Sequence, residues 1–482
     1  MSNRLARTLV FFTSASVLVI EVLAVRILAP YVGVSLEVFT AIIGVILAGI
    51  SAGAWAGGRA ADRAHPRRLL GPLLIAGGIS AIASPLIVDL IGPALSSDPV
   101  SIVVASVLGF LAPAALLSAV SPIVVKIRLA SLEETGSVVG SFSAIGTAGA
   151  IFGTFVTGFF LIAAFPTRPI VIALGATLTV AGLALSVISR KLVVPVALGL
   201  MGLSGLLVLF DGPCDYETTY HCAIVEVDED RPDGRVLVLD RTRNSYVDLS
   251  DPTYLEFRYI RLILDVINTE APEGPLNVVS VGGGGFTVPG YLNATRPGTT
   301  NMVLEIDRLL VDIGYTQLAL ADEIEVIVDD ARTSLQQLPD HMADVVIGDA
   351  YSGASVPWHL TTVEFMEDVS RVLAADGVYV MNVIDYGQRR FARSSAATIG
   401  TVFEHVAVLA PPLYIDGDGG GNYIIVASHR PIDVAALEEA IVARGGEEIG
   451  LSGSDLVDFV DGAMVLTDDF APVDQIVGSP SS

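Results

Sequence analysis

LNVVSVGGGGFTVPGYLNATRPGTTNMVLEIDRLL, residues 276–310, is the stretch that decides the fold of the second half of this chain. Its apolar runs at 276–281 and 301–306 have the length and β-branched content of buried parallel strands. A glycine-rich turn and a segment long enough for a crossover helix lie between them. The stretch therefore predicts a strand–turn–helix–strand unit, the building block of a doubly wound α/β sheet.

Three further apolar runs continue this pattern, at residues 324–328, 344–347 and 378–382. Helical segments separate most of them, as expected of parallel strands joined by crossovers. We therefore predict that residues 276–482 form a doubly wound, Rossmann-like α/β domain. In such sheets ligands bind at the carboxyl ends of the strands.

The segment 211–275 alternates apolar and polar residues in the manner of antiparallel strands. Strands are expected at 221–227 and 235–240, with a turn at 232–234 between them. A helix is expected near 252–268, with Asp251 as its N-cap and Pro252 at its first position. We predict a small β domain with a linking helix.

The first 210 residues have a different character. The whole chain is 52% hydrophobic and 16% charged, whereas a soluble domain carries about 25% charged residues. We predict that residues 1–210 form an α-helical transmembrane domain in the cell membrane, with the lipid bilayer as a partner. Seven apolar runs have roughly the 20-residue length of a span: 8–30, 36–58, 69–92, 99–122, 138–163, 169–189 and 192–210.

The charges are distributed unevenly along the chain. Residues 1–210 carry a net charge of +5 and residues 211–482 a net charge of −30. Such an acidic half argues against nucleic-acid binding, which needs positive charge to neutralise phosphates. Of the 12 basic residues in the first part, 10 fall on one side of the predicted spans. The N-terminus is therefore predicted to be cytoplasmic.

Two features, one in the membrane part and one just after it, have more than one interpretation. Glu21 and Arg26 lie inside the first run, where ionisable residues suggest a function by default. The alternatives are an ion pair between helices, or an Arg26 side chain that reaches the interface. Cys214 and Cys222 could form a disulfide outside the cytoplasm and would stay reduced inside it.

Glycines or acids follow the first four predicted strands of the α/β domain. Carboxylates at these positions can accept hydrogen bonds from the ribose and the adenine amine of an adenosyl ligand. The alternatives are a tight turn for the glycines and helix caps or turns for the acids. The third glycine of a dinucleotide motif is absent, and no P-loop occurs. In strand order the positions are Gly282-Gly283-Gly284-Gly285, Glu305 with Asp307, Asp330 with Ala331, and Asp349.

These residues match the spermidine synthase family of polyamine aminopropyltransferases, which residues 221–470 resemble as a whole. The matching features also include Asp240 at a strand end and Tyr254-Leu255-Glu256, where the family has Tyr-His-Glu. The whole chain resembles the fused, multi-span members of the family. Their signatures appear here at 21–30, 356–362 and 466–472. Residues 58–68 resemble a loop of major-facilitator transporters.

The resemblance implies aminopropyl transfer from decarboxylated S-adenosylmethionine to a small amine. No metal is expected, because the two cysteines are too few for a cysteine-based zinc site and the histidines are scattered. The resemblance also implies that Asp349 is the catalytic acid, as base or as positioning group for the amine, and that Tyr254 helps to place the amine. The remaining residues would bind the donor: Asn244 as a contact, Glu305 with Asp307 at the ribose, Asp330 with Ala331 at the adenine, and the glycines 282–284 beneath it.

Two positions depart from the family pattern. Gly285 and Ser352 stand where the family has aspartates that anchor cationic amines. Their loss argues against free putrescine as the acceptor. Methyl transfer from S-adenosylmethionine, or a sensor of polyamines or nucleosides without catalysis, are therefore alternatives. The sequence leaves open the acceptor, the side of the membrane on which residues 211–482 lie, and whether the chain forms a homo-oligomer.

Overall fold

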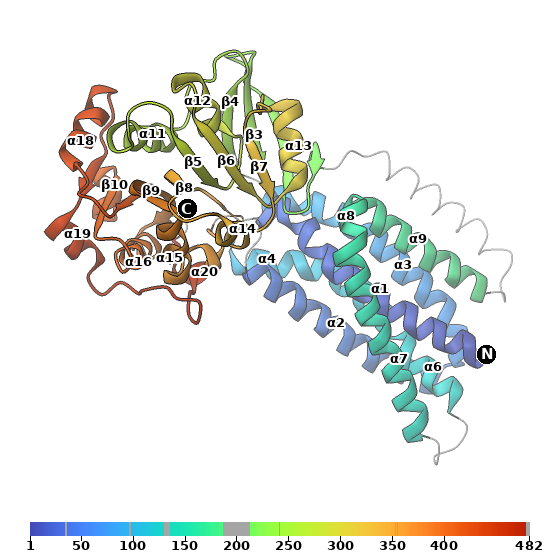
Figure 1. The fold of residues 1–482 in the computed structure, drawn as a ribbon. Helices are drawn as coiled ribbons and strands as arrows, with labels where there is room; N and C mark the ends of the chain where they lie inside the picture. The colour runs from blue at the N-terminus through green and yellow to red at the C-terminus, as the bar shows by residue number, and fades with distance from the viewer. Residues whose placement is uncertain are drawn as a thin grey trace. The chain divides into compact units, whose positions relative to one another are not determined.

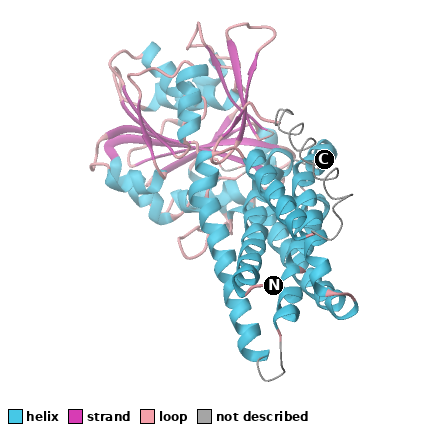
Figure 2. Ribbon diagram, turned by 90° about the vertical axis from the view of Figure 1, so that its right-hand side faces the viewer, coloured by secondary structure: helices cyan, strands magenta, loops and turns pink. Residues whose placement is uncertain are grey.

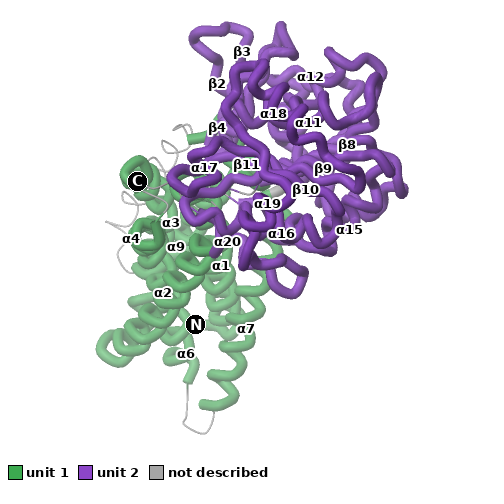
Figure 3. Tube along the Cα trace, turned by 90° about the vertical axis from the view of Figure 1, so that its left-hand side faces the viewer, with its two compact units in different colours: residues 1–222 green, residues 223–482 purple. Residues whose placement is uncertain are grey.

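A computed structural model describes residues 1–33, 36–95, 98–129, 135–186, 213–240, 242–351, 353 and 355–478. The chain divides into two compact units, Met1–Cys222 and Ala223–Ser482 (Figure 3). The predicted seventh run, 192–210, and Ser352 lie outside the described residues.

The first unit is a bundle of long helices (Figures 1 and 2). Within the described residues, six helical stretches are long and apolar enough to cross a membrane. At 1.5 Å per residue, even the 19-residue Thr167–Leu185 covers about 28 Å, close to the thickness of a hydrocarbon core. The six are Asn3–Val32 (α1), Leu36–Arg63 (α2), Pro66–Ala94 (α3, Pro66–Ile91, and η1, Gly92–Ala94), Pro99–Arg128 (α4, Pro99–Ser106, to α6, Val120–Arg128), Thr135–Leu161 (α7, Thr135–Val156, and η3, Thr157–Leu161) and Thr167–Leu185 (α9).

Small residues let these helices approach closely. A Cβ on Gly53 of α2 would lie 2.0 Å from the carbonyl oxygen of Ala115, in α5 (Ala112–Ser118). A Cβ on Gly149 of α7 would lie 2.2 Å from the carbonyl oxygen of Phe11, in α1. These glycines therefore serve helix packing, as is typical of membrane helices.

The second unit begins with a small antiparallel sheet. Strand β3 (Gly234–Leu239) pairs with β2 (Cys222–Val227) and with β4 (Thr242–Asp248). The predicted helix starts later than expected, because α11 spans Arg258–Glu270. Asp251 instead accepts hydrogen bonds from the backbone and hydroxyl of Thr253, and forms a turn ahead of the helix.

The large sheet has eight strands in the order β12-β10-β11-β9-β8-β5-β6-β7. Pairing is parallel from β9 to β7, which confirms the predicted doubly wound core, and antiparallel from β9 to β12. The sequence did not reveal this antiparallel extension. The strands are β5 (Asn277–Val281), β6 (Thr300–Glu305), β7 (Glu325–Val328), β8 (Ala343–Gly348), β9 (Leu373–Tyr386), β10 (His405–Ala410), β11 (Gly420–Ser428) and β12 (Ile449–Leu451).

Helices cover both faces of this sheet (Figure 1). Alternate residues of β5 enter opposite cores, with Val278 on the side of α11 and Val279 on the other. On the α11 side lie α12 (Thr287–Thr295) and α18 (Val434–Ala443). The other core is formed by α14 (Ala331–Gln337), α15 (Val363–Val372), α16 (Arg390–Ile399), α19 (Gly453–Val460) and α20 (Val473–Ile476).

Candidate active site

The strand order reverses between β5 and β8, and this switch point brings two predicted site elements together. The backbone N–H of Asp349 donates to the carbonyl of Val281 at 2.9 Å. Gly282 has φ +97°, and a Cβ there would lie 2.5 Å from the carbonyl oxygen of Asp349. Only glycine allows this approach at low cost, so the turn and Asp349 lie side by side at the carboxyl ends of β5 and β8.

Glu305 lies beneath the glycine turn, at the end of β6. One of its oxygens accepts the N–H of Gly283 and the other accepts the N–H of Asp307, both at 2.8 Å. The Glu305 carboxylate is thus held beside the turn. Asp307 is only 1% exposed and caps α13 (Arg308–Gln317), accepting from Leu309 and Leu310. The capping role considered for Asp307 is therefore present.

The small sheet brings Asn244 beside the glycine turn, where a Cβ on Gly284 would lie 3.1 Å from Asn244 Oδ1. Ser245 Oγ accepts the N–H of Gly285 at 2.8 Å and donates to Asn244 Oδ1 at 2.7 Å. A Cβ on Gly285 would lie 2.6 Å from the Cβ of Ser245. An aspartate at position 285 would therefore displace Ser245, whereas glycine leaves room for the Ser245 side chain.

Asp330 lies at the end of β7 and caps α14 through the N–H of Thr333, at 3.0 Å. Its other oxygen is 2.9 Å from Nε2 of His359. Burial alone would raise the pKa of Asp330, but the hydrogen bonds from Thr333 and His359 together lower it. Asp330 is therefore a carboxylate acceptor at neutral pH. Ala331 is the first residue of α14 and is buried.

Asp349 is held by a polar network. The Asn382 amide donates to Asp349 Oδ1 at 2.7 Å and accepts from the Asn422 amide at 2.9 Å. Tyr259, on α11, makes a side-chain hydrogen bond to the same carboxyl. Burial raises the pKa of Asp349 to about 6, and the hydrogen bonds from Asn382 and Tyr259 oppose this rise. A carboxyl with this pKa can take up a proton near neutrality.

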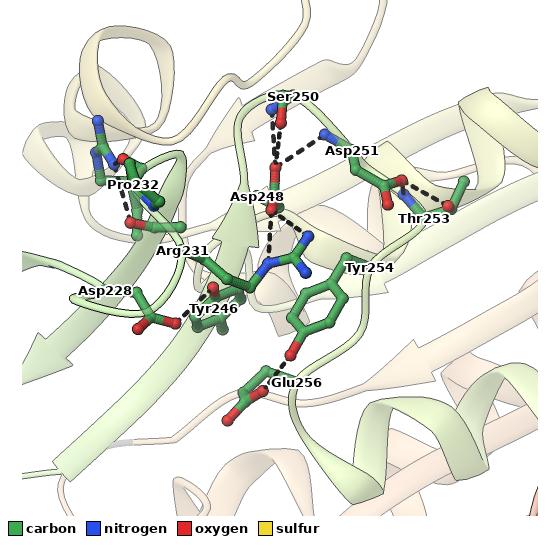
Figure 4. Close-up of polar contacts among 12 residues, drawn as sticks. Asp228, Arg231, Pro232, Tyr246, Asp248, Ser250, Asp251, Thr253, Tyr254 and Glu256 are labelled. Atoms are coloured by element: carbon green, nitrogen blue, oxygen red, sulfur yellow. Dashed lines mark hydrogen bonds and ion pairs between the residues drawn. The ribbon is translucent and has the colours of Figure 1, made fainter.

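Tyr254, the tyrosine singled out in the sequence, lies in a different set of contacts (Figure 4). Its hydroxyl donates to Glu256 at 2.8 Å, and the Arg231 guanidinium lies 3.8 Å from the centre of its ring. Arg231 in turn donates to Asp248. The tyrosine that contacts Asp349 is Tyr259, which sequence reasoning missed. A helix start at 258 instead of 252 would have drawn attention to Tyr259, in the first turn of α11.

Comparisons with known proteins identify the family. No protein family model matches the chain. It is 30% identical to a probable spermidine synthase from Corynebacterium glutamicum of known crystal structure, with a TM-score of 0.50, over 54% of this chain and 97% of the other. The chain belongs to the spermidine synthase family.

Further relatives agree with this assignment. A polyamine aminopropyltransferase of Chromobacterium violaceum is 23% identical over 238 residues, 49% of this chain and 87% of its own length. Another, from Vibrio vulnificus, is 28% identical over 152 residues, 30% of this chain and 49% of its own length. As a spermidine synthase homologue, the protein is a transferase, and its N-terminal helices are consistent with a fusion.

Proposed function

We propose that the protein is a membrane-anchored aminopropyltransferase that uses decarboxylated S-adenosylmethionine and an amine acceptor. The observation that carries the proposal is Asp349 at the switch point, beside the glycine turn and with a pKa of about 6. The family membership supplies the reaction type, and the six long apolar helices support anchoring.

In the proposed step the lone pair of the acceptor nitrogen attacks the donor carbon next to the sulfonium. The C–S bond breaks, its electron pair stays on sulfur, and methylthioadenosine leaves. The nitrogen loses one proton to Asp349, which passes it to solvent. Asn382 and Tyr259 hold the Asp349 carboxylate in position, because both hydrogen-bond to it.

The donor would bind along the strand ends. Glu305 would accept from the ribose hydroxyls, with Asp307 fixing the strand end behind it, and Asp330 would accept from the adenine amine. Asn244 would contact the donor from β4, and Gly282, Gly283 and Gly284 would let the backbone come close.

The acceptor is proposed to differ from free putrescine. The family's aspartate after the glycines is Gly285 here, and Ser245 occupies the space beside it. Fewer carboxylates in the crevice weaken the attraction for a small dication. An acceptor with a single amine, carried on a larger molecule, would need fewer carboxylates to bind it.

Methyl transfer is the alternative. An N-terminal histidine N-methyltransferase of Emericella nidulans is 26% identical over 141 residues, 28% of this chain and 25% of its own length. The missing acid at 285 also removes a partner for the free amine of the decarboxylated donor.

Analysis of the nucleoside product distinguishes the two reactions. The purified full chain is incubated with each donor and a panel of amines. We expect methylthioadenosine from the decarboxylated donor, and its loss in Asp349→Asn. S-adenosylhomocysteine from the ordinary donor would establish methyl transfer instead, and no product from either donor would contradict both enzymatic functions.

A further inference from the structure

Residues 214–222 form a small closed loop at the end of the first unit. A disulfide joins Cys214 to Cys222, whose Cα atoms are 5.2 Å apart. Within the loop, the Thr218 N–H donates to the carbonyl of His221 at 2.9 Å, and the Thr218 hydroxyl accepts the His221 N–H at 2.8 Å. Thr218 is 1% exposed. The loop is therefore a defined structural element.

The loop is fastened to two helices through Glu217. The Glu217 carboxylate accepts the N–H of Thr167 at 3.1 and 3.0 Å and lies 3.5 Å from the guanidinium of Arg26. The same guanidinium donates to the carbonyl of Thr218. Thr167 begins α9 directly after Pro166, which makes no side-chain cap. Glu217 thus supplies the negative charge that a helix N-terminus favours.

These contacts place the loop at one end of the bundle. The C-terminal ends of α1 and α3 and the start of α9 meet there, since Asp89 pairs with Arg168 at 2.6 Å and accepts from Tyr31 at 2.9 Å. Glu217 binds the residue next to Arg168, so the loop belongs to this end.

The opposite end of the bundle carries most of the basic residues. Lys126 pairs with Asp62 there at 2.8 Å, and Arg128 donates to the carbonyl of Met1 at 3.5 Å. By the positive-inside rule this is the cytoplasmic end. Its described basic residues are Arg4, Arg7, Arg59, Arg63, Arg67, Arg68, Lys126 and Arg128.

The chain changes sides between α9 and the loop. The C-terminal end of α9 lies at the basic end, because Ser186 meets Gly71 near the start of α3. Residues 187–212 separate it from the loop. These 26 residues lie outside the described residues, and the sequence predicts an apolar run of span length within them, at 192–210.

We infer that the loop 214–222 docks at the extracytoplasmic end of the bundle, and that the α/β unit, which starts at Ala223, lies outside the cytoplasm. A disulfide persists in that compartment and would be reduced in the cytosol. The location rests on the first unit alone. A second consequence rests on the proposed function as well: the acceptor is an amine outside the cytoplasm, and the nucleoside donor must be supplied across the membrane.

Site-directed labelling tests the location. Within the described residues no free cysteine occurs, and the sequence has only Cys214 and Cys222. Their replacement by alanine therefore gives a cysteine-free background. Val442→Cys places a thiol on α18, where Val442 is 68% exposed, and His65→Cys places one between α2 and α3. Intact cells are then treated with a membrane-impermeant maleimide, with a cytoplasmic marker protein as the control for integrity.

We expect label on Val442→Cys in intact cells and on His65→Cys only after permeabilisation. A protected Val442→Cys, or a His65→Cys labelled in intact cells, would overturn the inference. If the cysteine-free variant does not fold, the unmodified chain still tests the disulfide. In acid-quenched, denatured protein, both cysteines should react with a mass-tagged maleimide only after reduction. Reaction without a reductant would contradict the inference. Neither measurement depends on activity, so failure of the proposed function is distinguishable.

Discussion

At the scale of single residues, the ionisation of Asp349 controls the proposed chemistry. A base works when ionised, so kcat/KM should rise with pH through about 6, the pKa of Asp349, and level off above it. Asn382→Ala removes a hydrogen-bond donor that favours the ionised carboxylate of Asp349. The rising limb of the kcat/KM profile should therefore move to higher pH by about 1 unit. Profiles of kcat/KM measured from about pH 4 to about pH 9 would show this shift.

Asn301→Ala provides the matched control for that shift. Asn301 is also a buried amide on a strand of the sheet, but it donates to Asn293. Its loss should leave the limb at the same pH. A limb that stays unmoved in Asn382→Ala as well would show that Asp349 is not the group that titrates.

The two nearby tyrosines give a second prediction. Tyr259→Phe removes a hydroxyl bonded to Asp349, and kcat should fall by about tenfold, the worth of one good hydrogen bond. Tyr254→Phe removes only the bond to Glu256 and should change kcat less than twofold, within about 0.4 kcal/mol. Steady-state kinetics of both variants decide which tyrosine acts. The opposite ranking would favour Tyr254 as the positioning residue.

At the scale of elements, the turn after β5 should be intolerant of side chains. Gly282→Ala places a Cβ 2.5 Å from the Asp349 carbonyl in a left-handed conformation, and we expect a loss of about 1–3 kcal/mol in stability. Binding of methylthioadenosine should weaken with it. Thermal unfolding and calorimetric titration measure the two effects.

Gly290 is the control for this substitution. It lies inside α12, and a Cβ there would meet no atom within 4 Å. Gly290→Ala should leave stability unchanged or raise it by up to about 1 kcal/mol, since alanine favours helix. Equal losses in both variants would mean that the turn has no special role.

The strands of the large sheet that the sequence predicted are those formed by continuous apolar runs. Strands β5 to β8 are short apolar runs, and a glycine or an acid ends or follows each of them, so the sequence predicted both the strands and the candidate site residues. Strand β12, at the edge of the sheet, pairs antiparallel with β10, and nothing local in 405–410 or 449–451 specifies that partner. The start of α11 was misplaced because Asp251 and Pro252 also suit the turn that they form.

The site shows the same limit. Asp349, Glu305 and Asp330 were singled out in the sequence because each ends or follows a strand. Asn382 and Tyr259 were missed because their roles depend on contacts with Asp349 from β9 and α11, distant in the sequence. Only the folded sheet brings these groups together.

At the scale of the whole molecule, the helical unit should behave as an integral membrane domain. Within the part of the chain that the structure describes, six apolar stretches of 19 to 30 residues are long enough to span a bilayer. The full chain should stay in the membrane pellet after an alkaline carbonate wash and should enter solution with detergent. Release by carbonate would contradict membrane spanning.

The central claim is that this protein transfers an aminopropyl group. The most direct measurement is the mass of the amine acceptor after incubation of the full chain with decarboxylated S-adenosylmethionine. We predict that the acceptor gains one aminopropyl group for each methylthioadenosine released, and that Asp349→Asn gains none. An unchanged acceptor, or one that gains a methyl group from S-adenosylmethionine instead, would contradict the account.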